Sequence, residues 1–123
     1  MSNLSKKVKT AAASQPPAPQ KIEGAWRILE MELWDKDFID MEGPGKILFK
    51  KKGSGEMRFG CVQVELDWEF NADAGRAEFT FSGFDEMTEV SGRGWAKADG
   101  GKLIGRVFFH QGDNSGFKAK RAP

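Results

Sequence analysis

The sequence has no tyrosine, only one cysteine, Cys61, and only one histidine, His110. A single cysteine cannot form an intramolecular disulfide, which favours a reducing, cytoplasmic location. One cysteine and one histidine also fall far short of the ligand sets that zinc sites use, so we expect neither a metal nor a cofactor. No stretch approaches the roughly 18 apolar residues of a membrane-spanning helix. The sequence therefore predicts a protein that is not inserted in a membrane.

The N-terminal residues 1–21 contain four lysines, no acidic residue and the string Pro16-Pro17-Ala18-Pro19. This composition predicts a disordered tail at residues 1–21, followed by one domain at residues 22–123. The tail has no apolar core of the kind that a signal peptide needs. Without the four lysines, fifteen basic residues remain against eighteen acidic ones, which gives the domain a net charge of −3. Because nucleic-acid binding depends on clustered positive charge, we expect at most weak contacts by the tail.

Short segments of alternating apolar and polar residues dominate the rest of the chain, and glycine-rich turns separate them. Residues 46–51 and 56–61 flank Gly53-Ser54-Gly55 and predict a hairpin, and the apolar phase changes after Gly60. Further turns are expected at residues 71–75, 85–90, 99–101 and 112–115. Strands spaced by about ten residues predict an all-β fold, an antiparallel up-and-down meander of seven or eight strands closed into a small lipocalin-like barrel. An open two-sheet sandwich is the structural alternative.

The first predicted strand extends to about Trp34 and has two chemically different faces. Leu29 and Met31 share one face, whereas Glu30, Glu32 and Trp34 share the other, and the pattern leaves open which of them is inside. Residues 35–42 break the alternation and predict a loop or a single helical turn over one barrel end. This acidic stretch lacks the spacing of a calcium-binding loop.

Several polar residues are expected near the mouth of the barrel. Arg93 lies between two glycines and is predicted to project into the cavity, where it could pair with Glu30 or Glu32. Polar groups that converge in an apolar barrel mouth are the usual form of a binding site. The candidate ligand-binding residues are Glu30, Glu32, Trp34, Arg93, His110 and Asp113.

Three functions are compatible with this pattern. The first is a non-enzymatic module that binds a small polar molecule or a segment of a protein partner. The second is an accessory subunit that docks to a larger protein through an exposed edge or rim, with the tail as a tether. The third is a hydrolase or isomerase that uses His110 with Asp113 or Glu32. Ser115 lies in the same tight turn as His110, which does not favour a Ser-His-Asp site, and no catalytic residue is assigned.

Four groups of residues carry a likeness to known sequences. They are Trp26 with the string Glu30-Met31-Glu32-Leu33-Trp34-Asp35, then Phe84-Asp85-Glu86, Gly92-Arg93-Gly94-Trp95-Ala96, and Phe108-Phe109-His110 followed by Gly112-Asp113 and Ser115. Together they make residues 22–121 resemble a family of small uncharacterised bacterial proteins. The resemblance implies a compact bacterial domain and supplies no activity, cofactor or catalytic residue.

Overall fold

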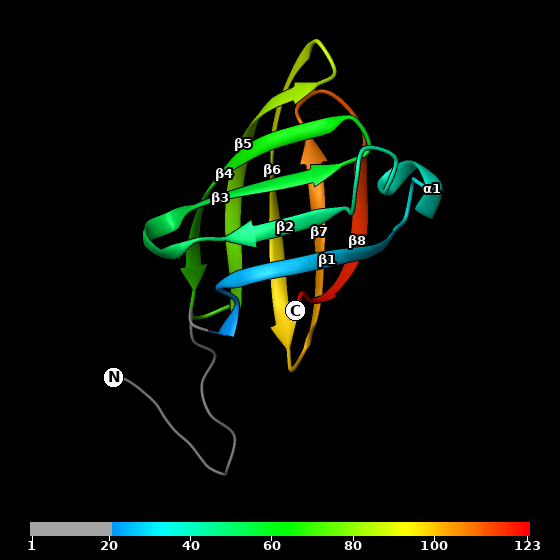
Figure 1. Ribbon diagram of the computed structural model, residues 1–123. Helices are drawn as coiled ribbons and strands as arrows, with labels where there is room; N and C mark the ends of the chain where they lie inside the picture. The colour runs from blue at the N-terminus through cyan, green and yellow to red at the C-terminus, as the bar shows by residue number, and fades with distance from the viewer. Residues whose placement is uncertain (1–20) are drawn as a thin grey trace, which may run out of the picture.

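Eight antiparallel strands close into one barrel in the computed structural model, which describes residues 21–123 (Figure 1). The strands are β1 (Gly24–Met31), β2 (Lys46–Phe49), β3 (Ser54–Phe59), β4 (Val62–Asn71), β5 (Arg76–Asp85), β6 (Thr88–Asp99), β7 (Lys102–Phe109) and β8 (Asn114–Arg121). Each strand pairs with the next one along the chain, and β8 pairs with β1. The predicted closed meander is therefore confirmed, and the sandwich alternative is wrong. Apart from Lys21, the predicted tail at residues 1–21 lies outside the described residues.

The side chains of β1 change sides at a bulge. The register between β1 and β8 shifts between Ile28 and Glu30. Trp26 and Ile28 are buried before the bulge, and Met31 is buried after it. One extra residue reverses the alternation, so Glu30 and Glu32 lie outside although the uninterrupted pattern places them on the same face as Trp26.

Between the strands, the described part of the chain forms two short helical turns, α1 (Lys36–Ile39) and η2 (Lys51–Gly53). The Asp35 carboxylate caps α1 by accepting a hydrogen bond from the Phe38 backbone N–H at 3.0 Å. Ile39 is fully buried, and α1 lies at one end of the barrel (Figure 1). The expected helical turn at residues 35–42 is thus present. Neither helical turn in residues 21–123 has the length needed to cross a bilayer.

The barrel interior is packed with aromatic and aliphatic side chains, and inward-facing glycines make room for some of them. Among residues 21–123, the buried hydrophobic core includes Phe49, Trp68, Phe79 and Phe81, whose rings make successive edge or tilted contacts. A side chain at Gly94 would meet the Phe79 ring at 2.5 Å. Because the core is filled in this way, places for a ligand are to be found at the ends of the barrel and on its outer wall.

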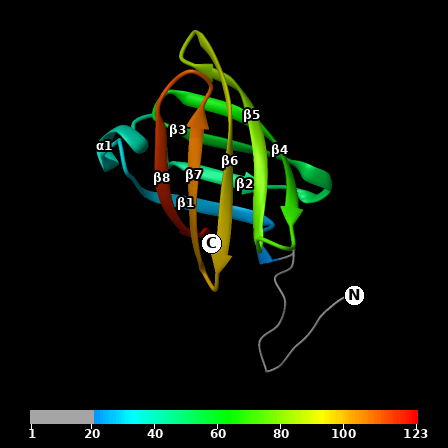
Figure 2. The ribbon, with the colours of Figure 1, turned by 180° about the vertical axis from the view of Figure 1, so that it is seen from behind.

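The hairpin of β5 and β6 extends beyond the rest of the barrel (Figure 2). The sequence pattern predicted a loop over residues 85–90. In the structure Asp85 pairs with Thr88, so only Glu86 and Met87 form the turn. The predicted loop is therefore wrong. The residues at the start of β6 are exposed and polar, so they lack the alternation of apolar and polar residues by which a half-buried strand is recognised in a sequence.

Candidate functional site at the mouth of the barrel

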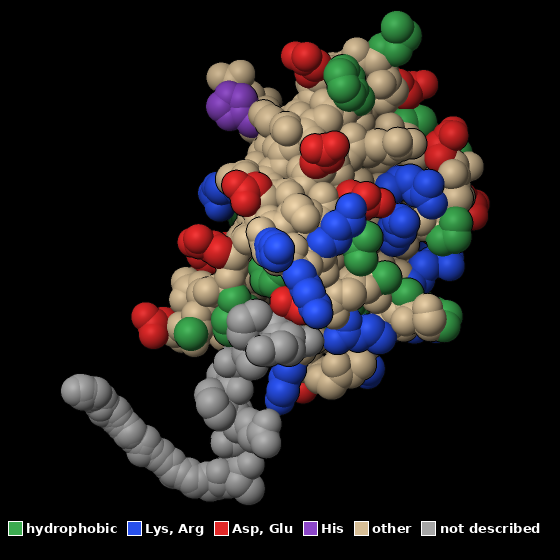
Figure 3. All heavy atoms as spheres, turned by 60° about the vertical axis from the view of Figure 1, so that its left-hand side comes forward, with side chains coloured by type: hydrophobic (Ala, Val, Ile, Leu, Met, Phe, Trp, Pro, Cys, Tyr) green, Lys and Arg blue, Asp and Glu red, His purple; other side chains and the backbone are tan. Residues whose placement is uncertain are grey.

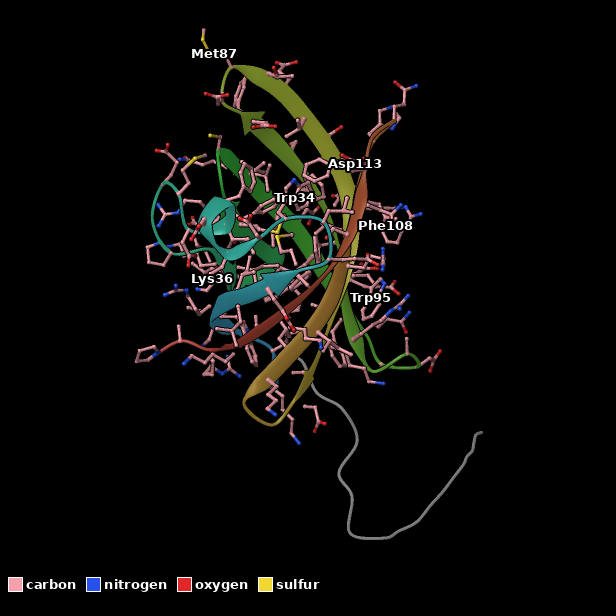
Figure 4. All side chains as sticks on the ribbon, turned by 90° about the vertical axis from the view of Figure 1, so that its right-hand side faces the viewer. Trp34, Lys36, Met87, Trp95, Phe108 and Asp113 are labelled. Carbon is pink, nitrogen blue, oxygen red and sulfur yellow. The ribbon has the colours of Figure 1, made fainter. Side chains whose placement is uncertain are left out.

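One end of the barrel carries a pocket with an apolar wall and a polar rim. The strands β1, β3, β5 and β7 all finish at this end. The pocket has a volume of about 420 Å3. Its main lining residues are Trp34, Phe38, Phe59, Phe109, Asp85, Glu89, His110 and Asp113. Trp34 and Asp113 lie at this end of the molecule in Figure 4.

The apolar wall is a cluster of aromatic rings around Trp34. The Trp34 ring lies 5.2 Å from Phe59, 6.1 Å from Phe38 and 6.3 Å from Phe109, measured between ring centroids. These distances are in the range in which aromatic pairs attract each other. The wall is partly open to solvent, because Trp34, Phe38 and Phe109 are only half-buried. It therefore presents ring surface to a ligand.

The chain that leads to Trp34 is fixed by β8. The Glu32 backbone N–H donates to the Gly116 carbonyl at 2.9 Å. The Leu33 backbone N–H donates to Ser115 Oγ at 3.2 Å, and the Ser115 hydroxyl donates to the Gly116 carbonyl at 2.9 Å. Ser115 is fully buried. Its hydroxyl holds the segment before Trp34 in place, and within residues 21–123 no hydrogen bond joins it to His110.

The turn between β7 and β8 supplies His110 and Asp113 to the rim. The His110 backbone N–H donates to the Ser91 carbonyl at 2.7 Å, and the Phe109 N–H donates to the Asp113 carbonyl at 2.9 Å. These bonds fix the backbone of the turn. Both side chains are exposed, and within residues 21–123 the structure gives no hydrogen bond between the His110 imidazole and the Asp113 carboxylate. The two groups line one pocket without forming a hydrogen-bonded pair.

Negative charge predominates at this end of the barrel. Asp85, Glu89 and Asp113 line the pocket, and its lining contains no lysine or arginine. The pKa of the nearby Cys61 thiol is raised by partial burial and by the carboxylates of Glu86, Glu42 and Asp85. Figure 3 shows the histidine and several acidic and hydrophobic side chains toward the upper end of one face, and the Lys and Arg side chains lower down together with further acidic side chains. The mouth is therefore suited to a positively charged group.

The two glutamates of the predicted site lie on the outer wall, away from this pocket. Glu32 accepts hydrogen bonds from the Gly116 backbone N–H at 3.3 Å and from the Arg106 guanidinium at 2.9 Å. Both bonds lower the pKa of the Glu32 carboxyl. Glu30 lies 3.3 Å from the Lys118 ammonium group. Each glutamate thus has a basic partner on β7 or β8.

Arg93 also points outward, and its expected pairing with Glu30 or Glu32 is wrong. Its guanidinium lies over the Phe108 ring, 4.3 Å from the centroid. Gly92 and Gly94 take the inward positions beside it, because a side chain there would collide with the rings of Phe81 and Phe79. Neighbouring residues of a strand face opposite sides, so Arg93 must face solvent. The two flanking glycines already carried this information in the sequence.

The structure divides the six predicted site residues into three places. Trp34, His110 and Asp113 meet at the mouth, Glu30 and Glu32 border a groove on the outer wall, and Arg93 borders a second hollow there. The sequence analysis missed Phe59, Phe109, Asp85 and Glu89. Phe59 and Phe109 are the last residues of β3 and β7. An apolar residue at the last inward position of a strand could have identified them in the sequence as residues that line the mouth.

Comparisons with protein-family models, with curated proteins and with solved structures gave no match to this chain. The resemblance to a family of uncharacterised bacterial proteins therefore remains a hypothesis. Within residues 21–123, no three His, Cys, Asp or Glu side chains lie together in an arrangement that could hold a metal ion.

Proposed function

We propose that the mouth of the barrel binds a small organic cation, such as an amine with an aromatic or aliphatic body. The observation that carries the proposal is the combination of a ring wall at Trp34 with three rim carboxylates and no lining lysine or arginine. A cation is attracted both to the face of an aromatic ring and to a carboxylate. The sequence predicts a small polar ligand, and the proposal specifies that this ligand carries a positive charge.

The pocket size supports a ligand of modest dimensions. Its volume of about 420 Å3 falls at the lower end of the range for small-molecule sites. A cation over an aromatic ring gains about 0.5–2 kcal/mol, and a hydrogen bond to a charged group contributes about 1.5–3 kcal/mol. Because the rim is exposed, we expect each carboxylate to contribute on the order of 1 kcal/mol, which is about fivefold in affinity.

The test is an NMR titration of the isotope-labelled full chain with benzyltrimethylammonium as a cationic probe and phenylacetate as its anionic counterpart. We expect the cation to shift the Trp34 indole resonance and the amide resonances of residues 109–113, with much weaker shifts from the anion. Asp113→Asn and Glu89→Gln should each weaken cation binding about fivefold. Glu65→Gln, on the outer side of β4, is the matched control and should change nothing. Equal shifts with both probes, or shifts with neither, would contradict the proposal.

An accessory role in a larger assembly is the second candidate, and the tip of the β5–β6 hairpin favours it. Met87 at the tip is 94% exposed, and Phe84 beside it is 50% exposed. Exposed apolar side chains on a projecting hairpin are typical of contacts with another protein. A photo-crosslinking residue placed at position 87 in the native host should capture one reproducible partner, whereas the same residue at position 73 should not. Identical products from both positions would exclude the tip as a docking site.

A further inference from the structure

The outer surfaces of β6 and β7 alternate between cations and apolar side chains. In the register of these two strands, each of three successive outward pairs joins one cation to one apolar residue. The pairs are Arg93 with Phe108, Arg106 with Trp95, and Lys97 with Ile104. Alternate residues on a strand are about 6.7 Å apart. The result is an alternation of positive and apolar positions on one face of the barrel, which we call the β6–β7 face.

Trp95 stands between two hollows on this face. It borders a groove of about 480 Å3 together with Ile104, and the rim of this groove holds Arg106 and Lys118 with their partners Glu32 and Glu30. It also borders a second hollow of about 410 Å3, where Arg76 and Arg93 lie beside Asp67, Glu69 and Glu78. The Arg76 guanidinium lies over the indole, 4.8 Å from its centroid. Figure 4 shows Trp95 and Phe108 projecting from the side of the barrel that lies opposite Lys36. The groove that Trp95 shares with Ile104 and Arg106 is thus the open space next to the indole on its other side from the second hollow.

Positive charge continues from the β6–β7 face onto β8. Lys118 and Lys120 pair in register with Ile104 and Lys102. Within residues 21–123, no ion pair is formed by Lys97, Lys102 or Lys120. Arg106 pairs with Glu32, and Lys118 pairs with Glu30. Acidic residues instead occupy the exposed positions of β4, namely Glu65, Asp67 and Glu69. The basic side chains of β6, β7 and β8 therefore meet the acidic side chains of β4 at the hollow that Asp67 and Glu69 share with Trp95.

We propose that the β6–β7 face binds single-stranded nucleic acid. Bases stack on exposed aromatic rings, and arginine and lysine side chains beside those rings hold the phosphates. An acidic protein segment would satisfy the cations and would leave the indole of Trp95 without a flat partner. A duplex keeps its bases stacked inside, so it offers Trp95 no base to stack on. The arrangement favours a single strand, with one base in the groove next to Trp95 and the backbone along the cations of β6, β7 and β8.

The first test is fluorescence anisotropy of a labelled oligothymidylate of about 12 nucleotides with the full chain at about 50 mM salt. We expect the single strand to bind more tightly than a duplex of equal length. Trp95→Ala should weaken binding roughly 5- to 150-fold, and Trp95→Phe should restore most of the loss. Glu65→Gln on the acidic β4 surface is the control and should not weaken binding. Thermal unfolding of each variant checks that the fold is intact.

The salt dependence gives an independent readout of the phosphate contacts. Lys97→Gln should reduce the slope of log K against log salt concentration by about 0.7, the value for one phosphate contact on a single strand. Binding that is unchanged by both Trp95→Ala and Lys97→Gln would assign it to the lysines of the N-terminal segment and overturn the proposal. Absence of binding would also overturn it, and tighter binding of polyglutamate than of the oligonucleotide would assign the face to an acidic protein segment. Because Trp95 lies outside the mouth, Trp95→Ala should leave the benzyltrimethylammonium titration unchanged.

Discussion

Replacing Gly94 by alanine tests how tightly the barrel interior is packed. Gly94 is buried on the inward side of β6. A Cβ atom there would lie 2.5 Å from Cζ of Phe79 and 2.6 Å from the Arg106 backbone carbonyl oxygen. The carbonyl belongs to the β6–β7 pairing, and the Phe79 ring is held between Phe49 and Phe81. Neither neighbour can move without a loss of hydrogen bonding or of packing.

The expected cost of Gly94→Ala follows from this overpacking. One extra methyl group in a close-packed core costs about 1–3 kcal/mol. Alanine also makes the unfolded chain less flexible than glycine does, which stabilises the folded state by about 0.4–1 kcal/mol. We therefore expect the free energy of unfolding to fall by about 1–2 kcal/mol. For a domain of roughly 100 residues, this loss lowers the Tm by about 5–15 °C.

The assay is thermal and urea unfolding of Gly94→Ala alongside Gly101→Ala. Gly101 lies in the β6–β7 turn, where an added Cβ would have no neighbour within 4 Å. The control should therefore change stability by less than about 0.5 kcal/mol. If Gly94→Ala is as stable as the natural protein, the Phe79 ring is not packed against β6 and the reasoning is refuted.

Three further substitutions or measurements test other contacts. The backbone N–H of Gly45 is the main cause that lowers the pKa of the Asp40 carboxyl from 3.8 to about 2. The ionised carboxylate therefore stabilises the fold above about pH 4, and this stabilisation is lost as the pH falls through 2. In urea unfolding, Asp40→Asn should cost about 1–2 kcal/mol at pH 7 and almost nothing near pH 2. Ser115→Ala removes the acceptor of the Leu33 N–H and should cost about 1–2 kcal/mol, measured the same way, and a neutral result would mean that Ser115 does not fix this segment. The raised pKa of Cys61 predicts slower alkylation by iodoacetamide at pH 8 than that of a free cysteine, and faster alkylation would contradict it.

The barrel topology was accessible from sequence because it depends on local signals. Alternation marks the faces of β4, β5 and β7, and glycine-rich turns mark their ends. The bulge between Ile28 and Glu30 could not be predicted from the sequence. There it appears only as a break in the alternation of apolar residues within β1, and the alternation does not show which of the two faces is buried. Burial resolves the ambiguity only after the other strands have been placed around Trp26.

The candidate site was predicted only in part, because it depends on which strand ends meet in space. Trp34, His110 and Asp113 were identified from their positions at strand ends, and they line the mouth together. Arg93 was expected to pair with Glu30 or Glu32, but alternation places it outside, over Phe108, whereas Glu32 pairs with Arg106 and Glu30 with Lys118. Opposite charges in a sequence do not reveal their partners when several combinations satisfy the same pattern.

Native mass spectrometry of the protein purified gently from its own host tests the proposed mouth site most directly. The masses under native and denaturing conditions would be compared for the natural chain and for the variant with both Asp113→Asn and Glu89→Gln. We predict an adduct of a small organic cation that is present on the natural chain, reduced on the variant and lost on denaturation. A bare chain, or an adduct that the variant retains in full, would contradict the account of the mouth as a cation-binding pocket.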